Sequence, residues 1–292
     1  MSRLRSPSLA LALILTASTL GLAGCPMPES KTGLSYAANA ERDYNLALDE
    51  FKAHNWLQAQ ALFREVKRKY AYSRYAPLAE LRIADADFEQ DKLGEAIRGY
   101  KQFVHDHRSL TAEVGYARSR IAEAQYNQIS DSILLPASEE RDQVATLESY
   151  RELKSFLQDY PESKESPRIC DLLEKVTIKL VGHELSVGRF YLAKNNFEAT
   201  VGRVQYAIRN FGSELTCRGT RPDPLQKGEP SELRTEFGLI PEALLLLGET
   251  YLKMRKWNEA REAFNTLKKR YPESALVAQA DNFLEFMKAR GV

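Results

Sequence analysis

The feature that most constrains the fold of this chain is a four-residue sequence, Tyr-Pro-Glu-Ser, which occurs at residues 160–163 and again at 271–274. The second copy follows a stretch in which a small residue, Ala260, precedes Phe264 and then Leu267. Spacings of four and three residues place these side chains on one face of an α-helix. Because proline cannot continue a helix and serine favours the start of another, each copy predicts a helix, a turn and a second helix.

The same frame of small and bulky residues recurs without the proline within residues 59–70, 96–107 and 200–211. A first helix precedes each copy, and the clearest example has Leu247, Gly248 and Tyr251 ahead of Trp257. This arrangement resembles the tetratricopeptide repeat, in which small residues let the two helices of a pair cross closely. We therefore expect an all-α fold, an α-solenoid of about five TPR-like helix pairs with a C-terminal capping helix.

The expected superhelical domain occupies residues 40–292. Two insertions, at 129–143 and 214–238, interrupt the repeats, and connections of such length are commonly functional or disordered. Since no stretch alternates in polarity with a period of two, no sheet is expected. The predicted helix pairs are 40–53 with 56–69, 75–90 with 93–106, 110–127 with 142–159, 167–193 with 196–210 and 239–254 with 257–270, and the capping helix is 275–289.

Residues 1–24 are predicted to be a signal peptide that takes no part in the fold. Their apolar stretch, Leu9 to Leu20, is shorter than the ~20 residues that a membrane-spanning helix needs. The sequence Leu-Ala-Gly-Cys at 22–25 then resembles the bacterial lipobox, which would make Cys25 the lipidated first residue of the mature protein. Residues 25–39 are interpreted as a tether, and Pro26 in place of an aspartate implies the outer membrane as the destination.

Charge and motif content argue against nucleic-acid binding and against catalysis. After Cys25 the chain carries 39 basic and 40 acidic residues, whereas nucleic-acid binding needs a basic surplus. We find no metal-ligand spacing, phosphate-binding loop or catalytic grouping, and therefore expect no metal, no cofactor and no enzyme activity. Export would permit a disulfide between Cys170 and Cys217, although a buried Cys170 and an exposed Cys217 that do not pair is the preferred interpretation.

Several segments together resemble the BamD/ComL family, the lipoproteins of the outer-membrane β-barrel assembly machinery. They are the lipobox, YSRYAPLAELRIADADF at 72–88, YAR at 116–118 and HELSVGRFYLAKNNFEATVGRV at 183–204. The likeness covers nearly all of the mature chain, although the 214–238 insertion is long and Ala71 and Arg108 stand in the place of proline. The resemblance implies a lipid-anchored periplasmic scaffold that assists the folding and insertion of outer-membrane proteins.

The resemblance also implies partners. The C-terminal repeats would hold the periplasmic domains of the central β-barrel subunit, the N-terminal repeats would receive unfolded outer-membrane proteins, and accessory lipoproteins are further candidates. A concave groove lined by the first helices suits an extended peptide. The candidate groove residues are Tyr44, Phe51, Tyr75 and Arg118, with packing inside the repeats as the alternative for each. The alternative family is a periplasmic repeat protein of the Tol-Pal or cell-division type, which has an N-terminal coiled coil and no lipobox.

Overall fold

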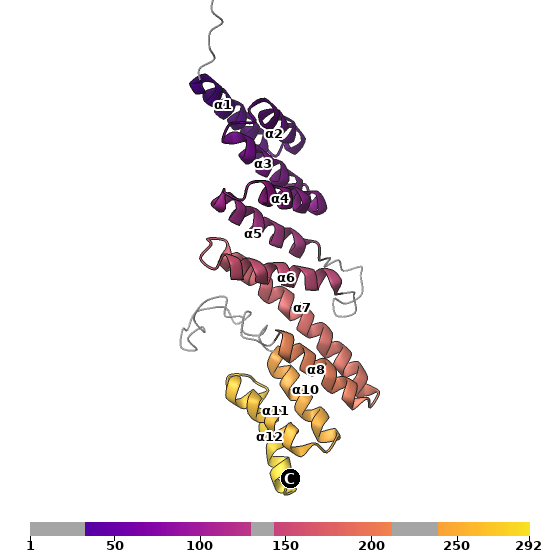
Figure 1. Ribbon diagram of the computed structural model, residues 1–292. Coiled ribbons are helices and arrows are strands. Elements are labelled where there is room, and N and C mark those ends of the chain that lie inside the picture. Colours follow the sequence, from indigo (N-terminus) through magenta and orange to yellow (C-terminus); the bar gives the residue numbers. More distant parts are fainter. Residues whose placement is uncertain (1–32, 130–142, 212–238) are drawn as a thin grey trace, which may run out of the picture.

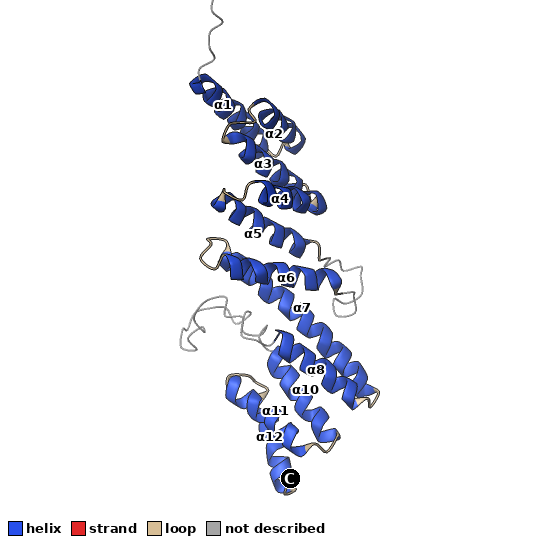
Figure 2. Ribbon diagram, viewed as in Figure 1, coloured by secondary structure: helices blue, strands red, loops and turns tan. Residues whose placement is uncertain are grey.

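A computed structural model describes residues 33–129, 143–211 and 239–292, and within these ranges the chain forms helices and no strand (Figure 2). The helices confirm the expected all-α class. None of the helices in the described ranges is both long enough and apolar enough to cross a bilayer. The helices are α1 Gly33–Lys52, α2 Trp56–Lys69, α3 Tyr75–Glu89, α4 Leu93–Asp106, α5 Thr111–Asn127, α6 Val144–Asp159, α7 Ser166–Ala193, α8 Phe197–Phe211, α10 Leu239–Lys253, α11 Trp257–Arg270 and α12 Val277–Ala289.

The helices stack in chain order into an elongated solenoid, with α1 at one end and α12 at the other (Figure 1). Each helix packs against the next, and the 28-residue helix α7 contacts α5 and α6 as well as α8 and α10. The buried side chains form three local clusters, contributed by α1–α3, by α3–α5 and by α5–α12. A succession of local cores is what stacked repeats produce, since each repeat buries its apolar face against its neighbours.

The predicted frame marks the core of each pair. Ala260, Phe264 and Leu267 of α11 are all fully buried. The Tyr-Pro-Glu-Ser sequence ends the helix as expected, because the backbone N–H of Tyr271 donates to Leu267 O at 2.9 Å as the last helical hydrogen bond. The serine acts differently from the prediction: Ser274 Oγ accepts from the N–H of Leu276 at 3.3 Å, which fixes the turn, and α12 has no side-chain cap.

The turns inside the pairs follow a rule that the sequence did not reveal. In four pairs the first helix ends on a non-glycine residue in the left-handed region, with φ between 56° and 61°. The residue after it donates its N–H to the carbonyl five positions earlier, as in the pair Lys256 N to Tyr251 O at 2.9 Å. This is the Schellman arrangement, which satisfies carbonyl groups left open at a helix end. The left-handed residues are His54, Asp91, Asn195 and Arg255.

Two sequence interpretations need correction. Helix α1 begins at Gly33, inside the segment 25–39 that was assigned to the tether, because Tyr36 packs its ring 5.3 Å from that of Tyr70 and extends the helix by contact with the first repeat. Cys170 of α7 is fully buried and is bonded in a disulfide, so its interpretation as an unpaired cysteine is wrong. The signal peptide, Cys25 and most of both insertions lie outside the described residues.

Candidate functional site

The three aromatic candidates lie together at the N-terminal end of the solenoid. Tyr44 of α1 and Tyr75 of α3 have ring centroids 5.3 Å apart, and each side chain is buried. Phe51, one turn from the end of α1, packs edge-on against Trp56 at 4.9 Å and also contacts Phe63 of α2 at 6.5 Å. The structure therefore places Tyr44 and Tyr75 in the first core cluster and leaves Phe51 partly exposed beside it.

Arg118 lies apart from these aromatics, on α5. Its guanidinium forms ion pairs with Glu152 at 3.5 Å and Asp159 at 3.3 Å, and it donates to Ser155 Oγ at 3.2 Å. All three partners are on α6, so Arg118 joins the two helices of the third pair. About a quarter of its side chain remains exposed.

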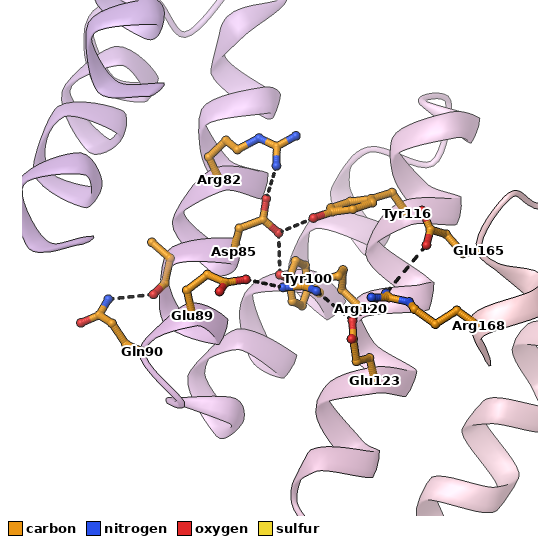
Figure 3. Close-up of polar contacts among 11 residues, drawn as sticks. Arg82, Asp85, Glu89, Gln90, Tyr100, Tyr116, Arg120, Glu123, Glu165 and Arg168 are labelled. Carbon is orange, nitrogen blue, oxygen red and sulfur yellow. Dashed lines mark hydrogen bonds and ion pairs between the residues drawn. The ribbon is translucent and has the colours of Figure 1, made fainter. Parts of the chain in front are cut away.

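A buried carboxylate that sequence reasoning missed organises the middle of the solenoid (Figure 3). Asp85 of α3 is 2% exposed and accepts hydrogen bonds from Arg82 at 2.5 Å, from the Tyr100 hydroxyl of α4 at 2.6 Å and from the Tyr116 hydroxyl of α5 at 3.0 Å. Charge this deeply buried needs such partners. Asp85 thus ties three successive helices to one point.

The network continues toward the C-terminal half through Arg120 of α5. This guanidinium donates to Glu89 of α3 at 3.0 Å and to Glu123 at 2.8 Å, and it lies 3.6 Å from the ring centroid of Phe88. Glu123 then accepts from Arg168 of α7 at 2.7 Å. We call the chain of contacts from Arg82 to Arg168 the polar spine, and it links α3, α4, α5 and α7 (Figure 3).

Electrostatics favour a structural role for the polar spine over a chemical one. Burial, reinforced by the charge of Asp85, raises the pKa of Tyr116 to about 12 and raises that of Tyr100 further. Burial opposes the charge of Arg82, but the adjacent Asp85 outweighs it and raises the pKa of Arg82. Both hydroxyls therefore stay protonated and donate, and Arg82 stays charged, so none of these groups is poised to exchange protons near neutral pH.

The remaining charged candidates are occupied within the fold. In the basic run of α2, Lys67 pairs with Glu80 at 2.8 Å and Lys69 with Asp43 at 3.3 Å, which weakens its appeal as a surface for anionic headgroups. His107 lies 3.5 Å from the same Glu80. Among the described residues, no three histidine, cysteine or acidic side chains come together as metal ligands.

Sequence signals for the polar spine exist in hindsight. Asp85 interrupts the small and apolar face of α3 between Ala84 and Ala86, both of which are buried. A charge inside an apolar face predicts a buried partner, and the tyrosines at the frame positions of the next helices were available to supply it. The pattern that identifies Tyr100 as a core residue also hides its hydroxyl from notice.

Comparison with known proteins agrees with the fold and extends it. A family profile described as "YfiO: Outer membrane lipoprotein" matches residues 37–218, and a tetratricopeptide-repeat profile matches residues 242–274. An outer membrane protein assembly factor BamD from Caulobacter vibrioides is 26% identical over 256 residues, which cover 87% of this chain and 73% of that protein. The protein of the same name from Neisseria meningitidis serogroup A is 23% identical, with 83% of each chain covered.

A BamD from Rickettsia prowazekii is 24% identical over 231 residues, which cover 79% of this chain and 80% of that protein. The match to the outer membrane lipoprotein profile takes in the first four helix pairs and more than half of the chain. The segments quoted above at 72–88, 116–118 and 183–204 all lie inside the matched range. The chain belongs to the YfiO family of outer membrane lipoproteins, whose curated relatives are named BamD.

Proposed function

We propose that this protein is an assembly factor for outer-membrane proteins that works as a lipid-anchored scaffold on the periplasmic face of the outer membrane. The observation that carries the proposal is the family match, together with relatives whose name is outer membrane protein assembly factor BamD. A solenoid with successive local cores supports a binding role, since it offers a long surface to extended partners. The Tol-Pal alternative gains no support from these comparisons.

The proposed anchor is Cys25, in the sequence Leu-Ala-Gly-Cys. Replacement of Cys25 by alanine should move the protein from the outer-membrane fraction to the soluble periplasmic fraction, because a soluble solenoid has no other anchor of comparable strength. As a matched control, Pro26→Asp keeps the lipidated cysteine and should shift the protein to the inner membrane. Retention of Cys25→Ala in outer-membrane fractions would count against the lipid anchor.

The proposed partners are the central β-barrel subunit of the assembly machinery, bound through its periplasmic domains, and unfolded outer-membrane proteins. Accessory lipoproteins are further proposed partners. Affinity purification from detergent-solubilised outer membranes tests the class of function directly. Recovery of a large β-barrel protein with periplasmic domains is the expected result, and repeated recovery of cell-division or Tol-Pal components would replace the proposal by the alternative.

We also propose that unfolded substrates pass near the N-terminal repeats, where the groove candidates lie. Of these, Phe51 and Arg118 are partly exposed, whereas Tyr44 and Tyr75 would have to leave the core to touch a guest. A photo-crosslinking amino acid at Phe51 or Arg118 should capture unfolded outer-membrane proteins during export. The same amino acid at Leu57, which is 72% exposed on α2, is the control. Equal capture at Leu57 would show a contact without a defined groove.

A further inference from the structure

Cys170 lies fully buried in the N-terminal half of α7, and the structure records it in a disulfide bond. The chain contains three cysteines, so within one chain the partner is Cys25 or Cys217. Both lie outside the described residues, and the choice between them follows from the described helices that lead to each. We propose that Cys170 pairs with Cys217, so that a covalent link holds the chain after α8 to the first half of α7.

The end of α8 lies beside the α6–α7 hairpin. The rings of Tyr150 on α6 and Phe211 at the end of α8 are 5.4 Å apart, and the Tyr150 hydroxyl donates to Asn210 O at 3.3 Å. Pairing α6 with α7 about their turn sets Tyr150 opposite Lys175, five residues from Cys170 or about 7.5 Å along the helix. Phe211 therefore lies about one helix diameter away from Cys170.

The length of chain to Cys217 suits this separation. Six residues lead from Phe211 to Cys217, and an extended chain of that length spans about 20 Å. A partly folded path of six residues is thus enough to bring the two cysteines within bonding range, which needs Cα atoms about 6 Å apart. No helix has to move for this pairing.

Cys25 is poorly placed by the same measure. It precedes the start of α1 at Gly33 by eight residues, an extended span of about 28 Å. Helix α1 packs against α2 and α3, whereas α7 packs against α5, α6, α8 and α10. Two pairs of helices with axes about 10 Å apart therefore separate α1 from α7, so even a straight chain would barely cover the distance. This argument does not depend on lipidation of Cys25.

Formation of the bond balances as a thiol–disulfide exchange. One thiolate of the pair attacks the disulfide of an oxidised dithiol oxidoreductase and forms a mixed disulfide, which releases one thiolate of the oxidant. The second thiolate of this chain then attacks the sulfur of the first and releases the oxidant as a dithiol. Two protons and two electrons leave the cysteines, and an oxidising exported compartment is where such a donor is found.

The consequence is a closed loop from Cys170 to Cys217 that contains the whole of α8. The loop fixes the start of the long insertion against the same part of α7 that packs on α5 and α6. It thereby reinforces the contact between Tyr150 and Phe211, at the point where the outer membrane lipoprotein match ends near residue 218. Cross-linking acts chiefly by restricting the unfolded chain, and a loop of this length should give a large effect.

Peptide mapping of the full-length protein tests the pairing. The protein is extracted from outer membranes, its thiols are blocked with N-ethylmaleimide in denaturant, and it is digested with trypsin without reduction. Cleavage at the basic residues gives peptide 169–175 with Cys170 and peptide 210–218 with Cys217. The expected result is these two peptides joined, with the joined species lost on reduction. A maleimide adduct on either peptide, or 169–175 joined to a peptide with Cys25, overturns the proposal.

A matched variant tests the consequence. Cys217→Ser removes one sulfur without touching the buried core around Cys170, and should expose one reactive thiol per chain in denaturant. Its melting temperature should fall by about 5 °C or more, and reductant should lower that of the wild type equally while leaving the variant unchanged. Equal melting of wild type and variant, or a wild type insensitive to reductant, would show that the link does not restrain the fold.

Discussion

Replacement of Gly248 by alanine should destabilise the last repeat, although alanine is the better helix former. A Cβ atom on Gly248 of α10 would lie 2.6 Å from Cζ and 2.8 Å from Cδ1 of Phe264 on α11. Carbon atoms ordinarily approach no closer than about 3.5 Å. Phe264 has no room to retreat, since it is fully buried and its ring stacks on Phe283 of α12 with centroids 5.1 Å apart.

Two opposing effects set the magnitude. A glycine replaced by alanine within a helix gains about 1 kcal/mol, and an extra carbon in a filled core costs about 1–3 kcal/mol. Because several ring atoms of an immobilised side chain are involved, we take the upper end and expect a net loss of about 2 kcal/mol in the free energy of unfolding. For a chain of this size that corresponds to a fall of about 4–8 °C in melting temperature.

Thermal unfolding followed by circular dichroism measures this change. The matched control is Gly202→Ala on α8, where an added Cβ meets no heavy atom within 4 Å. The control should melt about 2–4 °C higher than the wild type, since it gains helix propensity without a clash. Phe264→Leu in the Gly248→Ala background should recover part of the loss. A Gly248→Ala protein that melts at or above the wild type would refute the close crossing of α10 and α11.

Three further substitutions probe other parts of the solenoid. Ala260→Phe overpacks the same repeat and should cost ~1–3 kcal/mol, so an unchanged melting curve would mean that α10 and α11 are not paired as described. Asp85→Ala leaves the buried hydroxyl of Tyr100 and a guanidinium without their acceptor, and should cost about 3–5 kcal/mol by urea denaturation; a loss below 1 kcal/mol would contradict the polar spine. The hydrogen bond from Tyr70 to Asp43 lowers the pKa of that carboxyl below its model value, so its stabilisation is present above about pH 4 and is lost as the pH falls through the lowered value. Asp43→Asn should therefore narrow its stability difference from the wild type in acid, and a difference constant from pH 7 to pH 2 would exclude this linkage.

The helix map was predictable because its signals are local. The frame that places Ala260, Phe264 and Leu267 on one face, and the proline that ends the helix, act over a single turn or two. The expected helices therefore agree with α2 to α11 within two residues at their described ends. The family resemblance, confirmed by the profile match over 37–218, rests on the same local sequences.

The groove candidates show where local signals end. An aromatic residue on the first helix of a repeat satisfies the pattern equally well in the core and in a groove, and only the packing of Tyr44 against Tyr75 decides that both are buried. The left-handed turn residues were missed for a related reason. Arg255 at φ 59° gives no sign in the sequence, because its conformation is imposed by the crossing of two helices and not by its own preference.

By itself the sequence determined the repeated helix pairs, their order and their family, because apolar periodicity and helix-ending residues act between neighbours along the chain. The tertiary structure decided which side chains face one another: the three donors that surround Asp85, the ring of Phe264 against Gly248, and the disulfide of Cys170. These contacts join residues on different helices, and their energies depend on distances of a few tenths of an ångström that stacking alone fixes.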